Sequence, residues 1–105
     1  MRILFDQGTP VSLRTHLVKH AVEPVFELGW SNLENGELLA AAEGSFELLI
    51  TTHQQLRYQQ NLTERKLSIL VLMTTSWPRI KLHVPEIAEA IVQISLSEYR
   101  EIGFK

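Results

Sequence analysis

The segment from Phe46 to His53, FELLITTH, ends an apolar run in two threonines and a histidine. Such a run predicts a strand buried in a sheet. A mostly polar segment that includes Tyr58 follows it, from Gln54 to Leu62. In parallel α/β sheets, ligands and catalytic groups collect just beyond the carboxyl ends of the strands. The role of His53 is therefore the central question about function.

Upstream of this segment, apolar runs alternate with a helical pattern. Ile3 to Phe5 predict a strand buried on both faces, and Asp6 follows it at the junction with the first helix. Thr9 suits a helix N-cap, so a helix is predicted over about residues 10 to 21. Val22 to Leu28 is predicted to be a second strand.

The middle of the chain continues the alternation. A helix is predicted to start between Leu33 and Asn35 and to run through Ala42, since alanine and leucine favour helices and Gly44 suits a helix end. Phe46 to Thr51 is the predicted third strand, and residues 54 to 65 are expected to form a loop with a short helix. Ser68 to Met73 is apolar and partly β-branched, which predicts a central strand.

The C-terminal part is predicted to hold a loop, a helix and an edge element. Thr74 to Lys81 is the loop, and Val84 begins the last helix. Tyr99 to Lys105 is expected to add a short edge strand or a tail. The residues of the last helix expected to face inward are Ile87, Ala88, Ile91, Val92 and Leu96.

Strands alternate with helices along the whole chain, which predicts an α/β fold. The expected architecture is one domain over residues 1–105, with a mainly parallel sheet of four or five strands between two helix layers, α/β/α. Right-handed crossovers are expected between the strands.

Composition limits the classes of function. The 105 residues carry a net charge of −2 and a pI of about 6.1, which argues against a bulk nucleic-acid binder but still allows an enzyme that contacts a few phosphates. Cysteine is absent, which excludes disulfides and thiolate metal sites. No apolar run approaches the roughly 20 residues of a membrane span. A cytoplasmic protein with no membrane partner is expected.

The turn after the first strand carries an acidic residue in place of a phosphate-binding loop. Residues 6–10, DQGTP, contain one glycine and a proline, so the Rossmann and P-loop motifs are excluded. Asp6 stands where a metal-binding carboxylate is expected, and a helix cap explains it equally well.

In four segments, the chain resembles the small PIN-like proteins, relatives of the PIN-domain ribonucleases that include many toxin–antitoxin toxins. The similar segments, in matching order, are Ile3–Pro10, Asn35–Leu39, Leu48–Thr52 and Leu56–Leu62, and the resemblance covers about residues 2 to 75. It implies a PIN-like fold and a nuclease activity that depends on Mg²⁺ or Mn²⁺, with RNA as substrate.

The resemblance also implies a set of site residues. Asp6 matches the first family acid, and Glu37 is the candidate for the second, with Asn35 as the alternative position. Both acids are then metal ligands and, together with His53, catalytic candidates. His53 stands where the family has its third acid, so the sequence departs from the pattern there.

Three interpretations of His53 remain open. It is a substitution that removes an acid and weakens activity, a metal ligand or general base of an altered site, or a surface residue that caps a helix. Imidazole binds Mg²⁺ poorly but suits Mn²⁺, Zn²⁺ or Ni²⁺. The first interpretation is preferred, because losing a carboxylate removes a negative charge from a site that attracts cations.

Other polar and aromatic residues give further candidates. Arg57, Tyr58 and Gln59 offer groups that contact phosphates or stack on unpaired bases, or else they form a solvated helix face with Tyr58 packed down. His16 and His20 are four residues apart, a spacing that puts two metal ligands on one helix face, although solvated positions are preferred.

Two hypotheses about function follow. The first is a metal-dependent endoribonuclease of the PIN-like or toxin type. The second is a non-catalytic interaction module that binds an antitoxin-like protein or forms a homo-oligomer. The second is motivated by the missing acid, the mild charge and two tryptophans, Trp30 and Trp77, in predicted loops.

Overall fold

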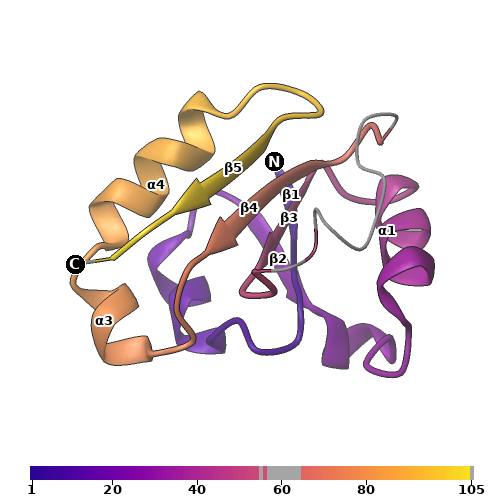
Figure 1. Cartoon of the computed structure of the whole chain (residues 1–105), viewed down its shortest axis with the longest axis horizontal. Coiled ribbons are helices and arrows are strands. Elements are labelled where there is room, and N and C mark those ends of the chain that lie inside the picture. The colour runs from indigo at the N-terminus through magenta and orange to yellow at the C-terminus, as the bar shows by residue number, and fades with distance from the viewer. Residues whose placement is uncertain (55, 57–64, 105) are drawn as a thin grey trace.

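The computed structural model describes residues 1–54, 56 and 65–104, which form a small α/β fold around a five-stranded sheet (Figure 1). All four strand pairs are parallel, and the strand order is β2-β1-β3-β4-β5. The strands are β1 (Arg2–Phe5), β2 (Ala21–Pro24), β3 (Leu48–Thr51), β4 (Ser68–Leu72) and β5 (Tyr99–Ile102).

The described helices are short. Two are 3-10 helices, η1 (Val11–His16) and η2 (Val25–Leu28), and three are α-helices, α1 (Asn35–Glu43), α3 (Trp77–Lys81) and α4 (Val84–Gln93). In this part of the chain, none has the length and apolar character needed to cross a membrane.

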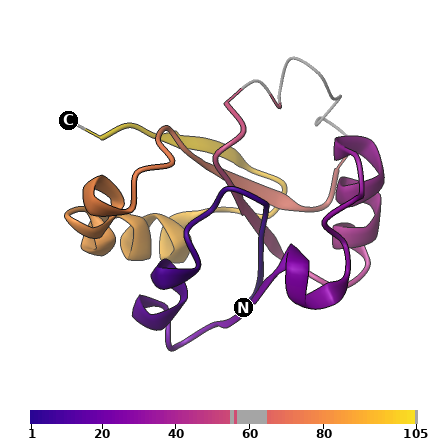
Figure 2. The ribbon, with the colours of Figure 1, turned by 90° about the horizontal axis from the view of Figure 1, so that it is seen from below.

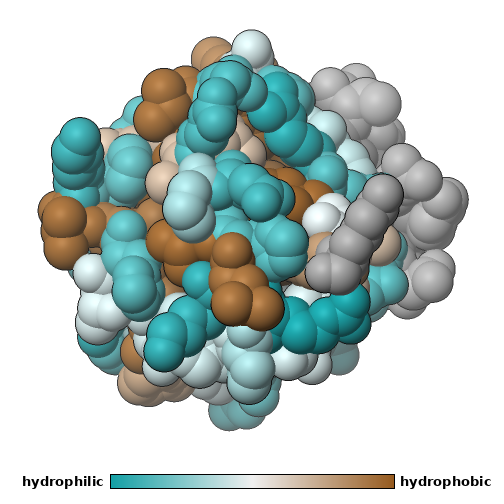
Figure 3. All heavy atoms as spheres, turned by 90° about the vertical axis from the view of Figure 1, so that its left-hand side faces the viewer, coloured by the Kyte–Doolittle hydropathy of each residue, from teal (hydrophilic) through white to brown (hydrophobic). Residues whose placement is uncertain are grey.

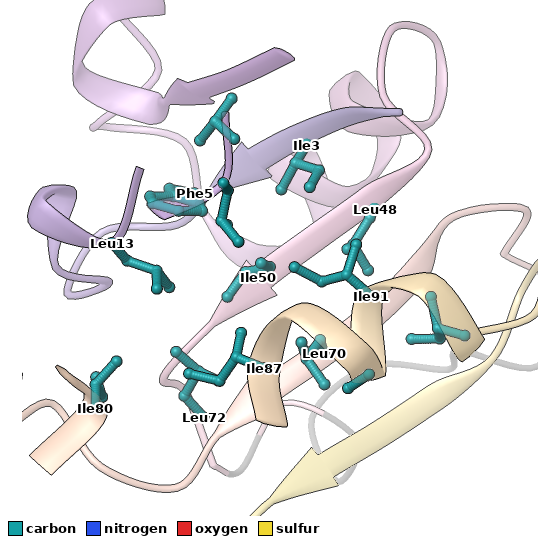
Figure 4. Close-up of a cluster of buried hydrophobic side chains, with 14 residues drawn as sticks. Ile3, Phe5, Leu13, Leu48, Ile50, Leu70, Leu72, Ile80, Ile87 and Ile91 are labelled. Carbon is teal, nitrogen blue, oxygen red and sulfur yellow. The ribbon is translucent and has the colours of Figure 1, made fainter. Parts of the chain in front are cut away.

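The sheet core is buried on both faces. Alternate residues of a strand point to opposite faces, so Ile3 and Phe5 join one apolar cluster and Leu4 joins another. The first cluster includes side chains of η1, α3 and α4, as Figure 4 shows for Leu13, Ile80 and Ile87. The second includes side chains of η2 and α1. This burial on both faces confirms the prediction made for β1, and the position of β4 inside the sheet confirms the prediction of a central strand.

The crossovers do not all have the same hand. The connections from β1 to β2 and from β4 to β5 both pass over the face of the first cluster, where η1, α3 and α4 lie (Figure 2). They move in opposite directions along the sheet, because β2 and β5 are its two edges. The two connections therefore have opposite hands. The expectation of uniformly right-handed crossovers is wrong for one of them.

Two N-terminal elements are shorter than predicted. The first helix is η1 alone, and Thr15 Oγ1 donates to the Ser12 carbonyl at 2.9 Å, a local bond that competes with regular helix. The second strand ends at Pro24, and the chain from Val25 to Leu28 turns into η2.

Two C-terminal predictions also need correction. The predicted loop around Trp77 contains helix α3, which begins because the side chain of Ser76 accepts a hydrogen bond from the Arg79 N–H at 3.4 Å. In the last helix Ile87 and Ile91 are buried as predicted. Val92 and Leu96 are each 78% exposed and do not face inward.

Candidate active site at the carboxyl ends of strands β1 and β3

The strand order defines where a ligand site is expected. In a doubly wound sheet of order 2-1-3-4-5, the connections leave β1 and β3 on opposite faces, and ligands bind at the carboxyl ends of this pair. Here η1 follows β1 on the face of the first cluster, whereas Leu56, in the segment that leaves β3, packs in the second cluster on the other face. Asp6 directly follows β1, and Thr51 ends β3.

A hydrogen-bonded chain joins the two strand ends. The hydroxyl of Thr51 donates to Asp6 Oδ2 at 2.8 Å and accepts from the backbone N–H of His53 at 3.0 Å. Because an N–H can only donate, the single proton of the Thr51 hydroxyl is directed at the carboxylate. The other oxygen, Asp6 Oδ1, accepts from the Gln7 N–H at 2.8 Å. The Asp6 carboxylate is thus held in one orientation.

The turn after β1 is packed against the end of β3. Gly8 has a φ of +92°, and a Cβ atom at this position would lie 2.9 Å from Thr52 Oγ1. The hydroxyl of Thr9 donates to the carbonyl of Ile50 at 3.1 Å, and the Asp6 N–H donates to the same carbonyl at 2.9 Å. Only glycine combines this backbone conformation with this close approach.

A pocket of about 250 Å³ opens beside Asp6, between the ends of β1 and β2. Of the lining residues that the structure describes, Asp6 is the one that carries a charge. One wall is apolar and the rim is polar, the usual character of a small-molecule site. The lining residues that matter below are Val11, Val25, Phe26, Gln7, Thr9 and Ser31.

Glu37, the predicted second acid, has a structural role. It is exposed in the first turn of α1, where its Oε1 accepts from the Glu34 N–H at 3.3 Å. The side chain of Glu34 in turn accepts from the Glu37 N–H, which completes a capping box. Glu37 does not line the pocket beside Asp6. Its role as a metal ligand stays a prediction.

Asp6 offers a metal ion one carboxylate from the protein. Within residues 1–54, 56 and 65–104, no three histidine or acidic side chains come close enough to hold one. In the same residues, no basic side chain forms an ion pair with Asp6. A magnesium ion often binds through one or two carboxylates and takes water and phosphate for the rest. Asp6 fits that kind of site, and does not fit a complete protein cage.

The other predicted residues lie elsewhere. His53 is half-buried at the end of β3 and takes part in the site through its backbone N–H. Arg57, Tyr58 and Gln59 lie outside the described residues. The ring of His16 packs on Trp77 with a centroid distance of 5.7 Å, and that of Trp30 packs edge-on against Phe46 at 6.1 Å.

Two parts of the site escaped prediction. The bond from Thr51 to Asp6 depends on the pairing of β1 with β3, which no local pattern indicates. Phe26 was placed in a predicted strand, whereas it lies in η2 on the pocket wall. The proline before η2, Pro24, is the one local signal that this strand ends early.

Comparisons of the chain with models of protein families, with curated proteins and with solved structures found no match.

Proposed function

We propose that this protein is a PIN-like, metal-dependent endoribonuclease of low activity, with its site at Asp6. The observation that supports the proposal is the Asp6 carboxylate, which lies at the switch point of the sheet and is oriented by the buried hydroxyl of Thr51. The proposal includes a three-layer α/β/α, PIN-like architecture. The two apolar clusters on the two faces of the sheet support that part.

In this proposal each residue has a defined task. Asp6 binds Mg²⁺ or Mn²⁺ through its carboxylate, and Thr51 keeps that carboxylate oriented. Glu37 contributes a second carboxylate from the first turn of α1, in addition to its cap. Once bound, such an ion lowers the pKa of its water and so supplies a nucleophile for phosphodiester cleavage.

His53 is the reason for expecting low activity. It lies two residues beyond the end of β3, and its N–H donates to the Thr51 hydroxyl that orients Asp6. In the proposal, an acid at this position adds a second negative charge to the site. An imidazole lacks the negative charge of a carboxylate and is a poor ligand for a hard cation. We therefore expect His53→Asp to bind Mg²⁺ more tightly and to cleave RNA faster than the native protein. A variant with unchanged binding and rate would contradict the lost-acid interpretation.

The decisive test is cleavage of a fluorescent, unstructured RNA with Mg²⁺ and with Mn²⁺. The native protein is compared with Asp6→Asn, which should lose activity on the order of 100-fold, since metal assistance is worth several kcal/mol. Glu89→Gln makes the same chemical change on the exposed surface of α4 and should keep full activity. Equal cleavage by Asp6→Asn, or no cleavage by the native protein with either metal, would refute the catalytic proposal.

A second candidate function is a non-catalytic interaction module, either a homo-oligomer or a toxin–antitoxin component. It is favoured by a hollow of about 210 Å³ between η1 and α4, bordered by Val18 and Val92, which are 83% and 78% exposed. Figure 3 shows apolar side chains exposed among polar ones on the side of the molecule that carries α3 and α4. Light scattering of the protein, alone and with the product of a neighbouring gene, tests this candidate. A strict monomer without a partner would count against it.

A further inference from the structure

An exposed aromatic ring stands beside Asp6. Phe26 is 58% exposed and lines the pocket that also includes Asp6. In the described part of the chain, it is the one Phe, Tyr or Trp side chain that is more than a third exposed. An exposed aromatic face at a polar site is the feature that proteins use to stack unpaired bases.

The backbone that carries the ring is held by a hydrogen-bonded turn. Its neighbour Val25 is only 3% exposed and anchors η2 in the second cluster. The Gly29 N–H donates to the Phe26 carbonyl at 3.3 Å, and the Trp30 N–H donates to the Val25 carbonyl at 3.0 Å. The backbone at Phe26 is thus set before any ligand binds, which lowers the entropic cost of placing the ring against a base.

A second apolar side chain borders the same pocket. Val11, at the start of η1, is 38% exposed and belongs to the lining together with Phe26. An exposed ion pair between Arg14 and Glu27, with N and O atoms 3.0 Å apart, links η1, which carries Val11, to η2, which carries Phe26. The amide of Gln7 and the hydroxyl of Ser31 also line the pocket and supply hydrogen-bonding groups.

The charge of the pocket decides which part of a nucleotide enters it. Among the described residues, no Lys, Arg or His belongs to its lining, and Asp6 is negative. A phosphate is therefore repelled from the interior, whereas a neutral base is not. The phosphodiester is best placed at the Asp6 side, where the proposed cation offsets both negative charges.

We infer that this pocket binds one unpaired base of single-stranded RNA, stacked on Phe26 and contacted by Val11, next to the bond that Asp6 acts on. This inference rests on the proposed function and specifies its substrate as unpaired RNA. A base inside a duplex is stacked on its neighbours and cannot lie on the ring.

The test is the binding of a phosphorothioate-linked RNA octamer, which resists hydrolysis, measured by fluorescence anisotropy with Mn²⁺ present. Phe26→Ala should weaken binding about tenfold, the loss expected for one stacked base, while Phe26→Trp keeps the native affinity. Leu82→Ala is the matched control, because Leu82 is 79% exposed and does not line the pocket. The same octamer in a duplex should bind more weakly than the single strand.

The inference and the proposed function fail in different ways. If the native protein cleaves RNA and Phe26→Ala binds and cleaves equally well, the inference is wrong and the nuclease proposal stands. If no cleavage occurs but binding still depends on Phe26, the nuclease proposal is wrong and the base site stands. The inference is also overturned if the native protein does not bind the octamer, or if Phe26→Ala changes the oligomeric state measured by light scattering.

Discussion

Two buried hydroxyl groups lie at opposite ends of the sheet and serve different partners. At the carboxyl end of β3, Thr51 is 0% exposed and donates to the Asp6 carboxylate at 2.8 Å. At the amino end of β4, Ser68 is 4% exposed and donates to the Ser95 carbonyl, also at 2.8 Å. Each hydroxyl also accepts one backbone N–H, from His53 and Ser97 respectively.

The difference separates a candidate site from a purely structural junction. Ser68 satisfies backbone groups of the connection that leads into β5, and it orients no side chain. Thr51 uses the same hydrogen-bonding capacity to orient a charged side chain at the switch point of the sheet. Two buried hydroxyls with similar hydrogen-bond distances can therefore differ in function, because one orients a carboxylate and the other binds only backbone groups.

The largest expected effect concerns the turn at the carboxyl end. Gly8→Ala should lower the free energy of unfolding by about 3 kcal/mol, because a Cβ meets Thr52 Oγ1 and the left-handed backbone is strained. Gly29→Ala should cost only about 1 kcal/mol, since its φ is +73° but no atom lies within 4 Å of the new Cβ. Urea denaturation of both variants measures the difference. Equal losses would show that the close approach at Gly8 has no energetic weight.

The two hydroxyls allow a matched experiment. Thr51→Val and Ser68→Ala should each lower the free energy of unfolding by about 2 kcal/mol, because each leaves buried backbone or carboxylate groups without a partner. RNA cleavage and octamer binding, measured well below both melting temperatures, should fall for Thr51→Val alone. A similar loss of activity in both variants would mean that general stability, and not the orientation of Asp6, is responsible.

A smaller effect separates the two roles of Glu37. Glu37→Gln keeps a side chain that can close the capping box, whereas Glu37→Ala removes it and should cost about 1 kcal/mol of stability. If Glu37 also binds metal, both variants lose RNA cleavage, because both lack the carboxylate. Native activity in Glu37→Gln would restrict Glu37 to its cap and leave Asp6 as the one metal-binding acid of the proposal.

The smallest effect is a pH dependence near the amino end of the sheet. Burial lowers the pKa of His20, the positive N-terminus and Lys19 lower it further, and Glu47 opposes them. The unfolded chain therefore binds the proton more tightly, so this destabilisation is absent above about pH 6.5 and grows as the pH falls below it. The melting temperature of the native protein should fall more steeply below pH 6.5 than the melting temperature of His20→Gln. Parallel curves would contradict this origin.

Much of the fold follows from local patterns. The apolar runs of β1, β3 and β4 predict strands, and that of β1 predicts burial on both faces, since a strand without polar alternation has no solvent face. The helix α1 begins and ends close to its predicted bounds, because its cap and Gly44 are local signals. The end of β2 at Pro24 and the helix α3 were missed, because both depend on one residue each, Pro24 and the capping Ser76.

The amino-acid sequence by itself determined that an acid, Asp6, follows the first buried strand and that threonines end the third. Only the tertiary structure decided that these residues meet, because β1 and β3 are adjacent although 42 residues separate Phe5 from Leu48 along the chain, counting residues 6 to 47. It also decided that Glu37 caps a helix and that Phe26 faces the pocket beside Asp6. Hydrogen bonds and side-chain exposure depend on how segments far apart in the sequence lie in space. The periodicity of residues along one segment gives no information about that.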